Sequence, residues 1–248
     1  MSVSQRNDCP VIITIDGPAG TGKSTVASLL ARRLGLEFLD TGAMYRAAAL
    51  VALEQGIQPD DGEMLAKAVE RADLHFDWQT DPPRVMLGDR DISQRIREMD
   101  VSAIVSIVAA QAPLRRVLVQ EQRRIAHKHP RLVSEGRDQG SVVFPDASLR
   151  FYLFADVAVR AHRRVAQLVA SGVAVDEQRV VRDIEERDRL DATRQVGPLV
   201  RPQGAIDIDT SNRTAEQVVD VMEAIARQRL PDADFKPDRE ALRDGAGH

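Results

Sequence analysis

The stretch IDGPAGTGKST, residues 15 to 25, constrains the fold of this chain more than any other part of the sequence. It follows the apolar run VIITI and leads into a helical pattern that opens at Lys23. The residues from Gly17 to Ser24 fit G-x-x-x-x-G-K-[ST], a pattern that requires a buried strand before it and a helix after it. We therefore expect a strand, a glycine-rich loop and a helix, in that order.

The composition of this loop also predicts its ligand. Glycines lack a Cβ, so the backbone N–H groups can turn inward and approach phosphate oxygens. The N-terminus of the following helix directs its partial positive charge to the same place. Lys23 would reach the β and γ phosphates, and Ser24 would offer its hydroxyl to Mg²⁺. Together these features predict a site for a nucleoside triphosphate.

Apolar runs and helical patterns alternate along the chain. Five short runs read as buried strands, at residues 11–15, 36–39, 131–135, 149–154 and 205–209. Helical patterns separate them, at residues 23–34, 43–55, 101–126, 157–171 and 215–229. Strands that alternate with helices pair in parallel through right-handed crossovers. The fold class is therefore α/β, with a parallel five-stranded sheet flanked by helices.

Two segments depart from this alternation. Residues 73–92 contain short alternating pieces joined by QTDPP and GD, which predicts a small antiparallel β meander inserted off the main sheet. After Pro231 the sequence is charged and poor in apolar residues, so we expect a frayed tail over residues 231–248.

Composition and charge limit the classes of partner. The net charge of −4 over 248 residues predicts no broad nucleic-acid surface. No run approaches the roughly 20 apolar residues that span a bilayer, and the N-terminus shows no signal-peptide pattern. Cys9 is the only cysteine, so no internal disulfide can form. We expect a cytoplasmic protein without a membrane partner.

Polar clusters at the ends of the later strands predict a second ligand near the loop. The segments LDTGAMYRAAAL (39–50) and SEGRDQGS (134–141) each follow a predicted strand, and the carboxyl ends of parallel strands carry ligands. Arg187, Asp191 and Arg194 are spaced i, i+4, i+7 and share one helical face. Arginines also recur at positions 160, 163 and 164. Each cluster alone is typical of a salt-bridged surface, but arginine also binds phosphate well.

Taken in order, these segments resemble those of the bacterial cytidylate kinases, which are P-loop nucleoside monophosphate kinases. The resemblance rests on IDGPAGTGKST, LDTGAMYRAAAL, SEGRDQGSVVFPDA, RAHRR and RDRLDATR, with IDIDTS as the closing strand, colinear from about residue 10 to 225. It implies one kinase domain over residues 1–248. Within it, residues 41–112 would form a nucleotide-acceptor insertion that includes the meander, and residues 158–194 a helical lid.

The same resemblance implies the reaction. ATP, with Mg²⁺ as cofactor, would phosphorylate CMP or dCMP, and the enzyme would act as a monomer. The ATP-binding residues would be Gly17, Pro18, Ala19, Gly20, Thr21, Gly22, Lys23, Ser24 and Thr25, and Ser24 would be the metal ligand.

The resemblance also implies roles at the acceptor site. Arg46 and Arg137 would hold the CMP phosphate, in a pocket shaped by Asp40, Thr41 and Tyr45. Ser106, Arg115 and Asp138 would read cytosine, Arg187 and Asp191 would contact the ribose, and Arg194 the sugar–phosphate end. Lys23, Arg137, Arg187, Arg194, Arg160 and Arg164 would be the catalytic set, with Arg163 as a further lid candidate.

Two features depart from the family's pattern. Gln139 stands where an apolar residue is usual, which would alter the packing beneath Asp138. In AAQAPLRRVL the proline comes one position late, and we therefore assign the base-reading role to Arg115 rather than Arg116.

Two other functions remain open at this point. One is a P-loop kinase of another small acceptor, such as UMP, shikimate or dephospho-coenzyme A. The other is a nucleotide-dependent switch, although the N-K-x-D motif of guanine-specific switches is absent from the sequence.

Overall fold

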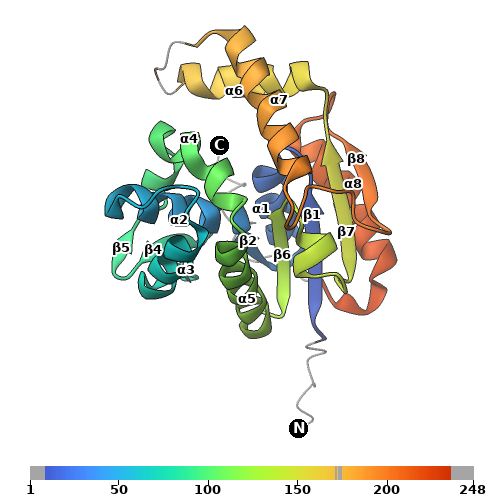
Figure 1. Ribbon diagram of the computed structural model, residues 1–248. Coiled ribbons are helices and arrows are strands. Elements are labelled where there is room, and N and C mark those ends of the chain that lie inside the picture. Colours follow the sequence, from blue (N-terminus) through green and yellow to red (C-terminus); the bar gives the residue numbers. More distant parts are fainter. Residues whose placement is uncertain (1–8, 171, 173–174, 236–248) are drawn as a thin grey trace.

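The centre of the protein is a parallel sheet of five strands (Figure 1). The structure is a computed structural model, which describes residues 9–170, 172 and 175–235. The strands are β1 (Val11–Asp16), β2 (Glu37–Asp40), β6 (Arg131–Gly136), β7 (Leu149–Phe154) and β8 (Ile206–Asp209). Their order is β2-β6-β1-β7-β8, and every pairing is parallel. The predicted fold class is confirmed.

The sheet is covered on both faces, which explains why its strands are continuous apolar runs. On one side lie α1 (Lys23–Leu34) and α8 (Ala215–Arg229), which share a core with Ile13 and Ile15 of β1. On the other side lie α2 (Thr41–Gln55), α3 (Gly62–Arg71), α4 (Met99–Ala109) and α5 (Ala112–Lys128), which form a second core.

The helices α6 (Val157–Ala170) and α7 (Glu177–Thr193) lie beyond the carboxyl ends of the strands, at the top of Figure 1. They bury a small cluster of their own, Ala161 with Val180 and Ile184. Because α6 and α7 share little apolar surface with the two main cores, this pair is held to the rest of the molecule mainly by polar contacts, described below.

The predicted meander is present as a three-stranded antiparallel sheet. Its strands are β3 (Leu74–Asp77), β4 (Arg84–Leu87) and β5 (Arg90–Asp91), in that order. Phe76 and Val85 are buried and join this sheet to the core around α2. The short 3-10 helix Arg95–Arg97 then leads into α4.

One helix prediction was wrong, and one helix was not predicted. The pattern over residues 101–126 is not one helix, because α4 and α5 meet at a bend of 98°. Pro113 lies in the first turn of α5, where it lacks the N–H that a continuous helix would need and would clash with the preceding turn. The helix α3 was not predicted; Asp61 caps it by accepting a hydrogen bond from the Met64 amide at 3.0 Å.

The last predicted segments lie partly outside the described residues. Residue 171, the end of the predicted fourth helix, is not described, and neither are residues 236–248 of the predicted frayed tail. The start of that tail is ordered: Pro231–Ala233 forms a 3-10 helix, and the Ala233 carbonyl accepts a hydrogen bond from Arg131 at 2.8 Å. In the described part of the chain no single helix is long and apolar enough to cross a bilayer, and α4 and α5 reach that length only together, across their bend.

Candidate active site

The glycine-rich loop follows β1 at the carboxyl edge of the sheet, and α1 begins directly after it. Gly17 is required by a close backbone approach, since a Cβ at this position would lie 2.1 Å from the Leu153 carbonyl oxygen of β7. Gly22 precedes α1 in a left-handed conformation and provides no side-chain cap. The N–H groups of the first turn are therefore left for an anionic ligand.

Lys23 is folded back into this loop. Its side chain is buried, and Nζ donates a hydrogen bond to the Pro18 carbonyl at 2.7 Å. Burial lowers the pKa of Lys23 to about 7, and the nearby cation of Arg137 adds to the effect. A phosphate in the loop would add negative charge beside this ammonium group and favour its protonated form.

Ser24 faces two carboxylates from neighbouring strand ends. Its hydroxyl donates to Glu135 Oε1 at 2.7 Å, and Asp40 lies beside Glu135. Burial raises the pKa of Asp40 to about 7, and the negative charge of Glu135 contributes. Hydroxyl and carboxylate oxygens are the ligands that Mg²⁺ prefers, so these residues fit a metal. The described residues hold no cluster of three or more acidic, histidine or cysteine side chains that could bind a metal, so phosphate oxygens would have to complete the coordination.

Glu135 was missed by the sequence reasoning, although an acidic residue at a strand end next to the loop was a usable signal. Asp16 at the end of β1 was missed as well. It is fully buried, and its two carboxylate oxygens accept the backbone N–H groups of Gln139 and Gly140, each at 2.7 Å. Burial raises the pKa of Asp16 to about 6 despite these hydrogen bonds.

A group of arginines lies near the lysine of the loop. Arg137 Nε donates to Asp191 at 2.8 Å, and Arg46 Nη1 donates to the Ser102 hydroxyl at 2.8 Å. Arg187 differs, because its Nε is buried without a hydrogen-bond partner among the described residues. Burial lowers the pKa of Arg187 to about 10, and Arg137 adds to this effect.

These cations crowd one another. The pKa of Arg46 is lowered by burial and by nearby cations, among them Arg164 of α6 and Arg137. The charge of Arg164 also lowers the pKa of Arg187. Burying guanidinium groups of one charge together is costly unless an anion joins them. The arrangement therefore favours a phosphate group among these arginines.

A buried ion pair lies next to this group. Arg115 of α5 donates to Asp138, and both side chains are almost completely excluded from solvent. The guanidinium of Arg115 also lies over the Tyr45 ring, 5.2 Å from its centre, and donates to the Ala109 carbonyl at 3.1 Å. Ser106, half-buried on α4, precedes Ala109 by one turn. Arg116, by contrast, is exposed. Of these two neighbouring arginines, only Arg115 brings a buried positive charge beside Asp138.

The end of α7 closes over this ion pair. Arg194 lies 3.8 Å from Asp138 and 3.7 Å from Asp191, and it donates to the Gly197 carbonyl. A Cβ at Gly197 would lie 2.3 Å from both Arg115 and Asp138, so the loop after α7 approaches the pair as closely as a backbone can.

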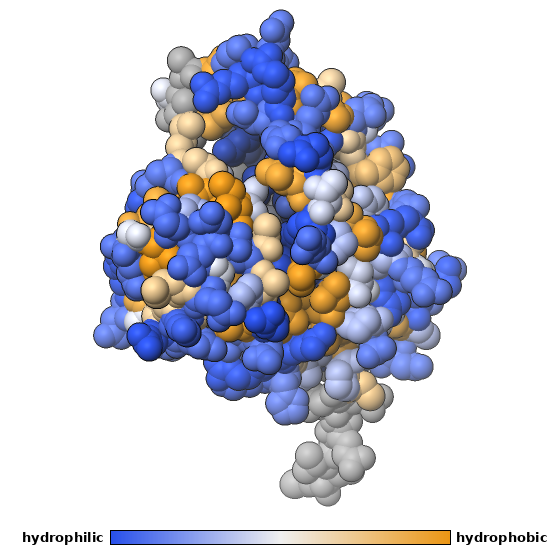
Figure 2. All heavy atoms as spheres, in the orientation of Figure 1, coloured by the Kyte–Doolittle hydropathy of each residue, from blue (hydrophilic) through white to orange (hydrophobic). Residues whose placement is uncertain are grey.

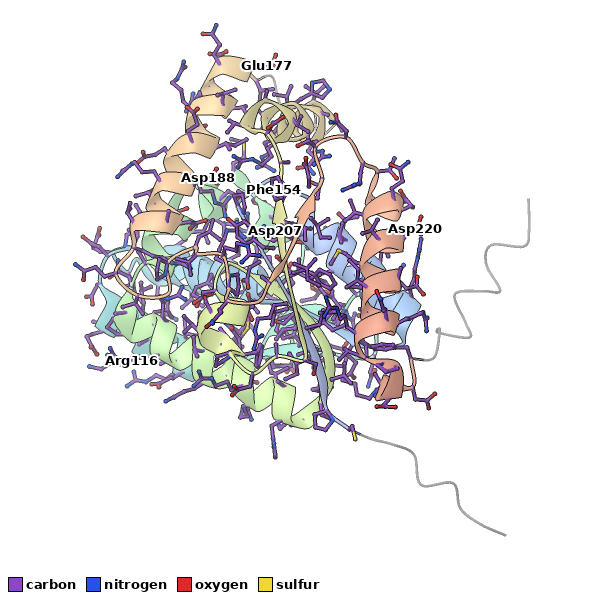
Figure 3. The ribbon with its side chains drawn as sticks, turned by 90° about the vertical axis from the view of Figure 1, so that its right-hand side faces the viewer. Arg116, Phe154, Glu177, Asp188, Asp207 and Asp220 are labelled. Carbon is purple, nitrogen blue, oxygen red and sulfur yellow. The ribbon has the colours of Figure 1, made fainter. Side chains whose placement is uncertain are left out.

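One arginine of α6, Arg160, connects the same region to the loop. Arg160 Nη1 donates to the Ala19 carbonyl at 3.0 Å and to Asp188 of α7 at 2.6 Å. Arg163 is engaged elsewhere, by the carbonyl and hydroxyl of Thr210 after β8. Figure 3 shows Glu177 at the outer end of α7 and Asp188 further along the helix, nearer to the sheet. Figure 2 shows the surface hollowed beneath the α6–α7 end, with hydrophilic residues above the hollow and both hydrophilic and apolar residues below it.

The fold thus brings together residues from distant parts of the sequence. The loop of residues 17–25, the strand ends at 40 and 135–138, and the face of α7 with Arg187, Asp191 and Arg194 meet at the carboxyl edge of the sheet. Such an arrangement can hold two phosphate-bearing ligands, one in the backbone loop and one among the guanidinium groups.

The sequence matches a known family over most of its length. The model of the cytidylate kinase family matches residues 13–228. A cytidylate kinase of Mycolicibacterium paratuberculosis is 44% identical over 219 residues, which cover 88% of this chain and 96% of that protein. One of Caldanaerobacter subterraneus is 44% identical over 218 residues, covering 88% and 95%. A bifunctional pantoate ligase/cytidylate kinase of Acaryochloris marina is 41% identical over 89% of this chain and 43% of its own length.

The solved structures similar to this chain are more distant. A gluconokinase of Sinorhizobium meliloti is 14% identical with a TM-score of 0.46, covering 96% of this chain and 98% of that one. A shikimate kinase of Bacteroides thetaiotaomicron is 14% identical with a TM-score of 0.44, covering 88% and 97%.

Proposed function

Because this chain belongs to the cytidylate kinase family, we propose that it transfers the γ-phosphoryl group of ATP to CMP or dCMP, giving ADP and CDP or dCDP. The observation that carries the proposal is the closeness of Lys23 to Arg137 and Arg187: burial lowers the pKa of the lysine, and the charges of the two arginines add to this effect. Cations gathered from a triphosphate loop and from a separate arginine group suit two anionic ligands that face each other.

The reaction requires alignment more than acid–base chemistry. The acceptor oxygen belongs to a phosphate monoester that is already largely anionic near neutral pH, so no general base is needed. The transition state is loose and spreads charge over the transferring oxygens. Lys23 and the arginines would stabilise that charge. Mg²⁺ bound with ATP would neutralise part of it, held through Ser24 with Glu135 and Asp40 nearby.

Cytosine is the base that best suits the pocket at Asp138. Cytosine carries an exocyclic amine beside ring acceptors, which matches the Asp138 carboxylate beside the Arg115 guanidinium. Uracil has a carbonyl oxygen in place of the amine and would meet the carboxylate unfavourably. This pairing favours CMP over the runner-up acceptor, UMP.

We further propose that residues 158–194 act as a lid and that residues 41–112 carry the acceptor. Arg160 contacts both the Ala19 carbonyl of the loop and Asp188 of α7, so it would couple the position of the lid to the binding of ATP in the loop. Closure of such a lid excludes water, which would otherwise hydrolyse ATP. We also propose that the enzyme acts as a monomer in the cytoplasm, with no nucleic acid or membrane as partner. The free, exposed Cys9 suits that reducing compartment.

A coupled assay of ADP formation tests this function. The protein is supplied with Mg²⁺ and ATP, and with CMP, dCMP, UMP, shikimate or dephospho-coenzyme A in turn, or with no acceptor. We expect ADP with CMP and dCMP at rates at least about tenfold above the others. Faster turnover with UMP would shift the assignment to the other pyrimidine. Slow hydrolysis that no acceptor stimulates would indicate a nucleotide switch instead.

A further inference from the structure

We propose that Gln139 is a positioning residue of the acceptor site, which holds Thr41 and the segment Arg137–Asp138 in one arrangement. This inference rests on the proposed function. Gln139 follows Asp138 directly and begins the short helix Gln139–Val143. Its side chain is buried, with 1% of its surface exposed, so it touches no ligand itself and would act through its neighbours.

The side-chain amide of Gln139 makes almost all the hydrogen bonds that it can. Its Oε1 accepts a hydrogen bond from the Ser134 hydroxyl at 2.8 Å. Its Nε2 donates to Thr41 Oγ1 and to Gln122 Oε1, both at 3.3 Å. Both amide hydrogens therefore have partners, at the start of α2 and in α5, and the oxygen has its partner in β6.

The backbone of Gln139 is fixed as well, because its N–H donates to Asp16 of β1 at 2.7 Å. One residue thus ties four elements together immediately after the two residues that would bind CMP. An Arg137 or Asp138 side chain can be placed accurately only if the backbone that carries it is held.

The Thr41 hydroxyl belongs to the same network of hydrogen bonds. It donates to the Glu135 carbonyl at 2.7 Å and accepts from Gln139. Its hydrogen is therefore not free to bond a phosphate oxygen in this arrangement. Thr41 instead holds the first turn of α2 against the end of β6, and the next turn of α2 carries Tyr45 and Arg46.

Gly136 makes room for this contact. A Cβ at position 136 would lie 2.7 Å from Thr41 Oγ1 and 2.8 Å from Gln139 Nε2. An apolar residue at position 139 could not satisfy the polar groups of Ser134 and Gln122, which are themselves fully buried. The buried surroundings in this chain are thus adapted to a glutamine.

The test is Gln139→Met, which keeps the length of the side chain and removes its hydrogen bonds. We expect the KM for CMP to rise about threefold to tenfold, with the KM for ATP changed by less than about twofold. Gln122→Met is the matched control, because it removes one buried partner of Gln139 and leaves the bond to Thr41. Its KM for CMP should stay within about twofold of the wild-type value.

A double-mutant cycle with Thr41→Val shows whether the effect passes through Thr41. If it does, adding Gln139→Met to Thr41→Val raises the KM for CMP by less than about twofold. Independent, multiplying effects would overturn the proposal. So would a variant whose melting temperature falls while both KM values stay unchanged, because that result describes a packing residue only.

A substitute variant and a first assay of the wild-type protein make the result interpretable. If Gln139→Met does not fold, as judged by circular dichroism, Gln139→Leu is measured in its place, with the same expected result. The wild-type protein is assayed first with CMP: if CMP does not stimulate ADP formation, the proposed function fails, whatever Gln139 does.

Discussion

Arg137 is the residue on which acceptor binding depends most in this account. It lies close to Lys23, donates to Asp191 and is half-buried at the strand end where the two proposed ligands would meet. Replacing it with alanine would remove the charge on the acceptor side while leaving the backbone loop intact.

We predict that Arg137→Ala lowers kcat/KM for CMP by about 10²-fold to 10³-fold, because the complex would lose a charge–phosphate contact that the bound ligands shield from water. ATP affinity, measured by calorimetry, should stay within about threefold. Arg116→Ala is the matched control: Arg116 is an exposed arginine of α5, labelled in Figure 3, and its loss should change neither value. Near-normal turnover in Arg137→Ala would contradict the assignment.

Asp191 determines the choice of sugar in the proposed complex. It pairs with Arg137 and lies 3.7 Å from Arg194, so Asp191→Ala will weaken both CMP and dCMP binding. The loss should be larger for CMP by about threefold or more, because only CMP has the 2′-hydroxyl that the carboxylate would accept from. Steady-state assays with both acceptors measure this, and equal losses would remove the ribose role.

Of the site residues that the sequence reasoning missed, some could have been derived from the sequence and others could not. Glu135 was within reach, as an acid at a strand end. The three partners of Gln139 come from positions 41, 122 and 134. No local pattern brings these positions together, because their meeting depends on how α2 and α5 pack against the sheet.

At the scale of elements, sequence reasoning succeeded where periodicity was strong. The strands and α1 were predicted to within two residues, since buried parallel strands are continuous apolar runs. The helix α3 was missed although its buried residues Leu65, Ala66, Ala68 and Val69 lie at helical spacing and Asp61 was a usable cap signal. The break between α4 and α5 had a visible signal in Pro113, which the apolar pattern on both sides obscured.

The glycine-rich loop depends on one close contact between elements. In Gly17→Ala the new Cβ would meet the Leu153 carbonyl of β7, so β1 and β7 or the loop must move. We expect a loss of at least about 3 kcal/mol in the free energy of unfolding and weaker ATP binding. Chemical denaturation and calorimetry measure the two effects.

Gly56→Ala supplies the control for that experiment. Gly56 ends α2 with a φ of 64°, and a Cβ there would meet nothing within 4 Å. Its cost should be only the left-handed backbone penalty of about 1–2 kcal/mol, with ATP binding unchanged. An equal effect of both substitutions would mean that the contact with Leu153 is unimportant.

For the whole molecule, buried Asp16 predicts how stability depends on pH. Burial raises its pKa from 3.8 to about 6 in the folded protein. Between these values the folded state binds more protons than the unfolded state, so stability falls as pH rises. The contribution is fully present below pH 3.8 and is lost by about pH 6, a change on the order of 3 kcal/mol.

Urea unfolding at pH 4, 5 and 6 measures this dependence. Asp16→Asn cannot titrate, so its stability should change less over the same interval than that of the wild-type protein. The same slope in both proteins would show that Asp16 is already ionised at pH 4 and that other carboxyl groups account for the change.

The central claim for the whole molecule is that a backbone loop and an arginine group hold two nucleotides face to face. A single ligand in which five phosphates join adenosine to cytidine would occupy both places at once. Calorimetric titration should show one equivalent per chain, a Kd at least about tenfold below those of ATP and CMP, and loss of binding of both nucleotides in its presence. A second equivalent, or continued binding of CMP to the saturated protein, would contradict the account.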